Sequence, residues 1–147
     1  MSLLRRYAWV ILALCDGGVL FYGLVILVRP DVLLQLGFES HTGASWLAFR
    51  SDEPMSADYL TWVVRMLGAY NVAFGVLALG IILRPFRRGQ AWAWWTLALG
   101  NLFAFGMPVT SDLYMGSIGF FEVIELAMVP LLLLALGATA KSSLGHR

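Results

Sequence analysis

Cysteine and histidine are scarce in this sequence, and their scarcity excludes several kinds of chemistry. The single cysteine, Cys15, rules out an intrachain disulfide and any paired-cysteine redox or zinc site. The two histidines, His41 and His146, fall in a loop and a tail, which excludes paired haem ligands within a membrane. Neither a glycine-rich phosphate loop nor a nucleophile motif is present. We therefore predict no catalytic residue, no metal and no cofactor, and the sequence favours a protein that is not an enzyme.

Charge is the other thing that the sequence has little of. Charged residues make up 13% of the 147 residues, hydrophobic residues make up 60%, and the mean hydropathy is +0.78. A water-soluble domain of this length is far less apolar. The formal net charge of +1 and the absence of a basic stripe also exclude nucleic acid as a partner. Membrane lipid is therefore the first partner to expect.

Four apolar segments are long enough to cross the roughly 30 Å of hydrocarbon in a bilayer. They cover residues 7–28, 59–83, 91–109 and 115–138. Proline follows the first two segments directly, at Arg29-Pro30 and Arg84-Pro85, and proline cannot continue a helix. Pro108 is expected to end the third helix, and Pro130 to kink the fourth. The predicted fold is all-α, an integral membrane four-helix bundle that forms a single domain over residues 1–147.

The basic residues predict the orientation of these helices, because short cytoplasmic loops retain lysine and arginine. Seven of the ten basic residues fall at the N-terminus, in the second connection or at the C-terminus, with no acidic residue among them. The opposite face carries six acidic residues against two arginines. We therefore expect a multi-pass protein of the inner (plasma) membrane with the N-terminus and C-terminus both cytoplasmic.

The connection between the first and second helices, residues 29–58, is a long external loop. Its apolar stretches at residues 32–36 and 46–49 predict short interfacial helices. Two readings remain open for them: a lid over an outward-facing cavity, or an amphipathic segment that rests on lipid headgroups.

Polar side chains at membrane depth are the most informative residues of the sequence. Each helix places one near the midplane, and two more lie nearer the outer face. An unpaired charge there is costly, so we expect these side chains to face one another, with Arg65 paired to Glu122. They form either a ligand site or internal hydrogen bonds that fix helix register. The six predicted site residues are Asp16, Arg65, Asn71, Asn101, Glu122 and Glu125.

Small residues on the same helices predict places where two helices approach closely. On the second helix these are Gly68, Ala69, Ala73 and Gly75. Elsewhere they are Gly17, Gly18 and Gly100.

Two stretches give the chain a resemblance to a known group. They are Arg65-Met66-Leu67-Gly68-Ala69-Tyr70-Asn71 with Phe74-Gly75, and Ala91-Trp92-Ala93-Trp94-Trp95 after a basic turn. Together they resemble small bacterial four-helix membrane proteins grouped as DoxX-like, over about half of the chain. The resemblance implies a compact bundle with an inward-facing arginine on the second helix, here Arg65, and no settled activity.

Three functions are compatible with these observations. The first is a buried polar pocket near the outer leaflet that binds a small amphipathic or lipid-like ligand, a hydrophobic small molecule. The second is a non-catalytic accessory subunit of a larger membrane complex. The third is a proton-coupled small transporter that acts as a homo-oligomer, a dimer.

Overall fold

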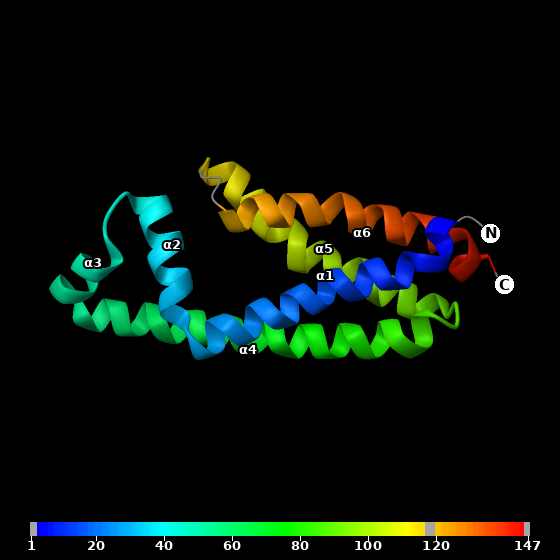
Figure 1. The fold of residues 1–147 in the computed structure, drawn as a ribbon, viewed down its shortest axis with the longest axis horizontal. Coiled ribbons are helices and arrows are strands. Elements are labelled where there is room, and N and C mark those ends of the chain that lie inside the picture. Colours follow the sequence, from blue (N-terminus) through cyan, green and yellow to red (C-terminus); the bar gives the residue numbers. More distant parts are fainter. Residues whose placement is uncertain (1–2, 117–119, 146–147) are drawn as a thin grey trace. The chain divides into compact units, whose positions relative to one another are not determined.

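The described part of the protein is helical throughout. The computed structural model describes residues 3–116 and 120–145, and for residues 112, 115 and 120–122 it describes the backbone alone. No strand occurs in these residues. The elements, shown in Figure 1, are α1 (Leu3–Val28), α2 (Pro30–Thr42), α3 (Trp46–Asp52), α4 (Pro54–Ile81), the π-helical turn η1 (Ile82–Phe86), α5 (Ala91–Met115) and α6 (Phe120–Leu144).

Three helical stretches among the described residues are long and apolar enough to cross a membrane. They are Leu3–Val28, Pro54–Phe86 and Val123–Leu144. Helix α5 is also long, at 25 residues, but three tryptophans near its start and Asn101 near its middle make it less apolar. Length and composition therefore support three of the four predicted spans.

The long helices also carry large apolar side chains on their outer surfaces. Leu14 is 71% exposed on α1, Leu77 is 68% exposed on α4, and Phe103 is 66% exposed on α5. A soluble monomer rarely displays apolar surface on this scale. These helices are therefore suited to a surrounding of acyl chains.

The helix boundaries follow the prolines only in part. Pro30 begins α2, and Arg29 before it has φ −128° and ψ 64°, so α1 ends at Val28 as predicted. Pro85 does not end α4 abruptly. The backbone widens into the π turn η1, in which the Gln90 amide donates to the Pro85 carbonyl at 3.2 Å. A wider turn accommodates a residue that has no N–H to donate.

The expectation that Pro108 ends the third helix is wrong. Pro108 lies inside α5, which continues to Met115, and Pro130 lies inside α6, which continues to Leu144. A proline interior to a helix removes one hydrogen bond, but the remaining bonds can carry the helix past it. Met115, the predicted first residue of the fourth helix, is the last residue of α5, and Gly116 after it forms a turn with φ 69°. Helix α6 begins at Phe120, after residues that the structure does not describe.

The chain forms two compact units, and α1 and α4 each contribute to both. Unit 1 comprises Met1–Gly17 and Val76–Arg147, and unit 2 comprises Gly18–Gly75. Unit 2 therefore holds the second half of α1, the helices α2 and α3, and the first part of α4. Unit 1 holds the first half of α1, the end of α4, η1, α5 and α6.

Glycines let α1 and α4 pack closely within unit 2. A Cβ atom built on Gly68 would lie 2.7 Å from the Leu27 amide nitrogen, and one built on Gly75 would lie 2.6 Å from the Leu20 Cβ. Only glycine allows the two backbones to come this near. The predicted packing role of Gly68 and Gly75 is thus confirmed, whereas a Cβ on Gly17 would meet nothing within 4 Å.

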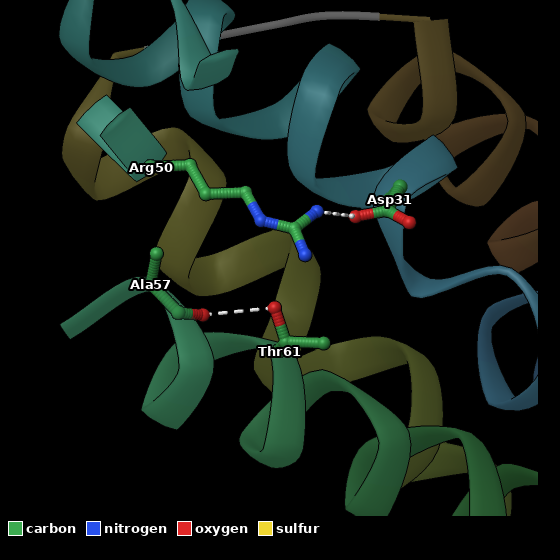
Figure 2. A network of polar contacts seen from close by, with 4 residues as sticks. All are labelled: Asp31, Arg50, Ala57 and Thr61. Carbon is green, nitrogen blue, oxygen red and sulfur yellow. Dashed lines mark hydrogen bonds and ion pairs between the residues drawn. The ribbon is translucent and has the colours of Figure 1, made fainter. Parts of the chain in front are cut away.

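Helices α2 and α3 form a small aromatic core over the start of α4. Trp46 is fully buried there, and Phe38 packs edge-on against it at a ring distance of 5.4 Å. On the surface of this region, the Arg50 Nη1 atom donates to the Asp31 Oδ1 atom at 3.2 Å, and Figure 2 shows Arg50 of α3 reaching to Asp31 of α2. The two predicted interfacial segments are therefore both helical.

Unit 1 buries one stripe of each of its helices. Helix α5 runs beside α6 and also contacts η1, as Figure 1 shows for α5 and α6. The buried residues repeat mainly at intervals of three and four, which places them on one face of each helix. They are Ala8, Leu12, Cys15 and Asp16 on α1; Ala78, Ile82 and Phe86 on α4 and η1; Ala93, Leu97, Asn101 and Phe105 on α5; and Leu132, Ala135, Leu136, Thr139 and Ser143 on α6.

Candidate functional site

Asp16 is a carboxylate in the core of unit 1. It follows Ala8 and Leu12 at intervals of four along α1, so the face of the helix that buries these apolar residues buries Asp16 as well. Its exposure is 0%. Neither carboxyl oxygen has a hydrogen-bond partner among the described residues. Asp16 is thus a buried acid whose acceptor atoms the described protein leaves unsatisfied.

Asn101 is the corresponding polar residue on α5. It belongs to the buried stripe that contains Leu97 and Phe105, and it is 4% exposed. Its Nδ2 atom donates to the Leu97 carbonyl oxygen at 3.0 Å, one turn back along the same helix. This bond fixes which way the amide points, and the other end, the Oδ1 atom, has no partner among the described residues.

The structure brings the Asp16 and Asn101 side chains together. The Asn101 amide lies near enough to the Asp16 carboxyl to be its hydrogen-bonding neighbour, although no donor of the described residues reaches strict hydrogen-bond geometry with either carboxyl oxygen. The pair therefore holds three buried oxygens without a hydrogen bond from the described residues, and the second N–H of the Asn101 amide is its remaining donor. We refer to these atoms, Asp16 Oδ1, Asp16 Oδ2 and Asn101 Oδ1, as the acceptor cluster.

No described cation is buried near the acceptor cluster. The buried polar or charged residues among those described are Asp16, Asn101, Thr139 and Ser143. Thr139 is already engaged, because its hydroxyl lies 3.0 Å from the carbonyl oxygens of Ala135 and Leu136. An unpaired charge near the centre of a bilayer costs about 2.5 to 3.5 kcal/mol on the mild insertion scale. The cluster is therefore chemically suited to receive a donor, above all a positively charged one.

A metal ion is a poorer match for these residues. Among the described residues, no group of three or more histidine, cysteine, aspartate or glutamate side chains is placed to hold a metal. Cys15 is buried beside Asp16 in the sequence, but a lone thiol and one carboxylate do not make such a group.

The other four predicted site residues occupy different environments. In unit 2, Arg65 is exposed on α4, and Asn71 is half-buried where a Cβ on Gly23 would lie 2.8 Å from the Asn71 Cβ. In unit 1, Glu125 is half-buried on α6. The side chain of Glu122 lies outside the described residues, so its pairing with Arg65 stays a prediction. The pair that the structure does bring together is Asp16 with Asn101.

Two further contacts, which the sequence did not predict, hold the end of unit 1 that contains the start of α1. The Arg87 guanidinium lies over the Trp9 ring at 4.4 Å from its centroid, and this joins the turn before α5 to α1. The Trp94 Nε1 atom donates to the Leu136 carbonyl at 3.0 Å, and this joins α5 to α6. The sequence signal for both was the basic turn flanked by aromatic residues, but nothing in it paired particular residues.

Comparison with family models, with curated proteins and with solved structures finds no match.

Proposed function

We propose that this chain is a four-helix protein of the inner membrane with both termini in the cytoplasm, and that it binds a small amphipathic molecule at the Asp16–Asn101 pair. The observation that carries the proposal is the burial of Asp16 with neither carboxyl oxygen hydrogen-bonded by the described part of the chain. Buried polar groups in proteins are nearly always hydrogen-bonded. A bound molecule that donates to the cluster accounts for the exception.

The depth of the pair supports an amphipathic ligand. Asp16 lies about 20 Å along α1 from its first described residue, at roughly 1.5 Å per residue. This is close to the middle of a span that crosses about 30 Å of hydrocarbon. A molecule that reaches this depth needs an apolar body for the acyl region and a polar head for the acceptor cluster.

The positions of the basic residues support the proposed orientation. Arg5 and Arg6 lie at the start of α1, Arg87 and Arg88 at the turn before α5, and Lys141 in the last turn of α6. The Arg87–Trp9 contact places the first two groups at the same end of unit 1. Lysine and arginine at one end of a set of spans are typical of the cytoplasmic side.

Arg65, Asn71, Glu122 and Glu125 remain part of this proposal as polar anchors nearer the outer leaflet. In that arrangement they would extend the ligand site outward from Asp16 and Asn101. Their contribution is tested separately from that of the acceptor cluster, by the variants Arg65→Ala and Glu125→Gln.

The test is retention of a native small molecule. The protein is purified from its own membranes in a mild detergent, and molecules that remain bound are identified by mass spectrometry after gel filtration. We expect a small molecule to be retained by the wild type, lost in Asp16→Asn and Asn101→Leu, and retained in Asp31→Asn, which removes an exposed carboxylate on α2. Equal retention in the Asp16 and Asp31 variants would overturn the proposal.

The same preparation distinguishes the other two functions. The wide apolar outer faces of the helices also suit an accessory subunit. That function predicts a second polypeptide at fixed stoichiometry and no small molecule. The burial of Asp16 also suits a proton-coupled transporter, which predicts dimeric particles and a proton flux in liposomes that Asp16→Asn abolishes.

A further inference from the structure

Arginines gather at the end of unit 1 that contains the start of α1. Arg84, Arg87 and Arg88 lie in and directly after η1, and Arg5 lies in the first turn of α1. All four side chains are exposed. No aspartate or glutamate occurs in residues 1–15 or 76–111, so these segments supply no acidic side chain to neutralise the four charges.

The Trp9 ring connects the arginines of the two segments. The Arg87 guanidinium lies 4.4 Å from the Trp9 ring centroid, and this contact attaches the turn after α4 to α1. Arg5 precedes Trp9 by four residues, so both lie on the same face of α1, and helical side chains lean toward the N-terminus of their helix. Arg5 and Arg87 are therefore neighbours of one ring, although they belong to different elements.

Arg84 and Arg88 add two charges on one side of the turn. The Arg88 amide donates to the Arg84 carbonyl oxygen at 3.2 Å, so the two residues are one helical turn apart. Phe86 between them is buried, which holds this turn against the rest of unit 1. Like charges at this spacing repel each other. A bound anion would remove that repulsion.

We infer that these four arginines, together with Trp9, form a basic site for the head group of an anionic phospholipid. A phosphodiester has two free oxygens and one negative charge, and a guanidinium group pairs with two such oxygens at once. The arginines match the phosphate in geometry and exceed it in charge, which favours a head group that has no cation of its own. The inference goes beyond the proposed function, because the basic site is separate from Asp16 and Asn101 and requires neither.

Exposed apolar and aromatic side chains beside the basic site favour a lipid over a free phosphate ion. Leu83 precedes Arg84 and is 49% exposed, and Trp92 and Trp95 near the start of α5 are 55% and 53% exposed. Tryptophan is typical of the boundary between head groups and acyl chains, and basic clusters at this boundary are typical sites for anionic lipids. A lipid can place its phosphate against the arginines and its acyl chains along these residues, whereas a free phosphate gains nothing from them.

Two lipids with the same acyl chains test the charge of the head group. The full chain is purified in a mild detergent and titrated with dioleoylphosphatidylglycerol or dioleoylphosphatidylcholine, and bound lipid is counted by native mass spectrometry. We expect phosphatidylglycerol to bind about tenfold more tightly, since its head group has a net negative charge and each arginine near it adds to the attraction. Glycerol 3-phosphate in excess should not displace it, because that ion lacks the acyl chains.

Variants at exposed arginines connect this preference to the basic site. Arg84→Gln with Arg88→Gln should lower the affinity for phosphatidylglycerol about tenfold, and Arg5→Gln, on a separate helix, should lower it about fivefold. The matched control is Arg29→Gln with Arg50→Gln, which removes two exposed charges from unit 2 and should leave the affinity unchanged. Either basic-site variant suffices for the test, provided that it unfolds in detergent at the wild-type midpoint.

Trp9 should act by positioning Arg87. Trp9→Leu keeps every charge but removes the ring beneath the guanidinium, and it should lower the affinity for phosphatidylglycerol about threefold. Trp9→Phe keeps an aromatic face and should bind nearly as tightly as the wild type. Wild-type affinity in Trp9→Leu would overturn the part of Trp9 in the basic site.

Equal affinity for the two lipids, or an equal loss in the basic-site and control variants, would overturn the inference. Displacement by glycerol 3-phosphate would show that the site takes a soluble phosphate, and would overturn its assignment to a lipid. None of these results bears on the proposed function, which Asp16→Asn tests. That variant should bind phosphatidylglycerol as the wild type does.

Discussion

Gly23 of α1 and Gly68 of α4 pack backbone against backbone: a Cβ atom on Gly68 would lie 2.9 Å from the Gly23 carbonyl oxygen. Both glycines are buried within unit 2. Inside a membrane, lipid removes the hydrophobic gain that draws helices together in water, so close backbone packing is a main source of helix association. This contact therefore fixes the distance between the two helices in unit 2.

Replacing Gly68 with alanine should destabilise the protein. The added methyl group would meet the Leu27 amide nitrogen at 2.7 Å, and backbone atoms cannot move aside without separating the helices. We expect a loss of about 1 to 3 kcal/mol, measured as a lower midpoint of thermal unfolding in detergent. Gly80→Ala on the same helix is the matched control, since a Cβ there meets nothing within 4 Å. It should be neutral or stabilising, and an equal loss in both variants would contradict the close-packing explanation.

Trp46 should carry much of the stability of the α2–α3 region. Its side chain is fully buried against Phe38 and Phe49, so Trp46→Ala would remove a large packed ring and leave a cavity. We expect a loss of about 3 to 5 kcal/mol for unfolding of this region, measured by hydrogen exchange of the α2 and α3 amides. Trp62→Ala is the control, because Trp62 is 57% exposed. If the α2 and α3 amides exchange at similar rates in the Trp46→Ala and Trp62→Ala variants, the buried Trp46 ring does not stabilise this region.

The Asp31–Arg50 ion pair should contribute little. Both side chains are close to half exposed, at 45% and 49%, and exposed ion pairs are worth about 0 to 1 kcal/mol. Asp31→Ala and Arg50→Ala should therefore leave the unfolding midpoint nearly unchanged, and the double variant should show a coupling energy within the same small range. A coupling well above about 1 kcal/mol would mean that this pair is less solvated in the membrane-bound protein.

Cysteine labelling tests the proposed orientation. In a Cys15→Ala background, one variant carries Ser51→Cys on α3 and another carries Arg88→Cys in the turn before α5, both at exposed positions. A membrane-impermeant maleimide should label only the first variant in intact spheroplasts and both variants after lysis. Labelling of the Arg88 variant in intact spheroplasts would reverse the assignment of the cytoplasmic side.

The sequence predicted those helix boundaries that depend on residues within or next to the helix itself. The end of α1 at Val28 and the start of α5 at Ala91 follow from local signals, a proline after one and a basic turn before the other. The continuation of α5 through Pro108 did not follow, because one missing hydrogen bond is a small local loss that the rest of the helix can absorb. Helix α4 begins at Pro54, ahead of the apolar run, and Ala57 in its first turn is buried in the cluster with Trp46, a contact that periodicity does not contain.

What the sequence by itself determined is the apolar character of the helices and which polar residues would cost free energy in an apolar surrounding. Long apolar runs indicate a lipid surrounding, and Asp16 and Asn101 would be costly in lipid wherever the helices place them. Only the tertiary structure decided which polar residues meet. Rotation of a helix about its axis and its distance from a neighbour are set by contacts such as Gly23–Gly68 and Trp94–Leu136, which join residues far apart in the chain. That is why the burial of Asp16 beside Asn101, with three oxygens that no described residue hydrogen-bonds, became visible only in three dimensions.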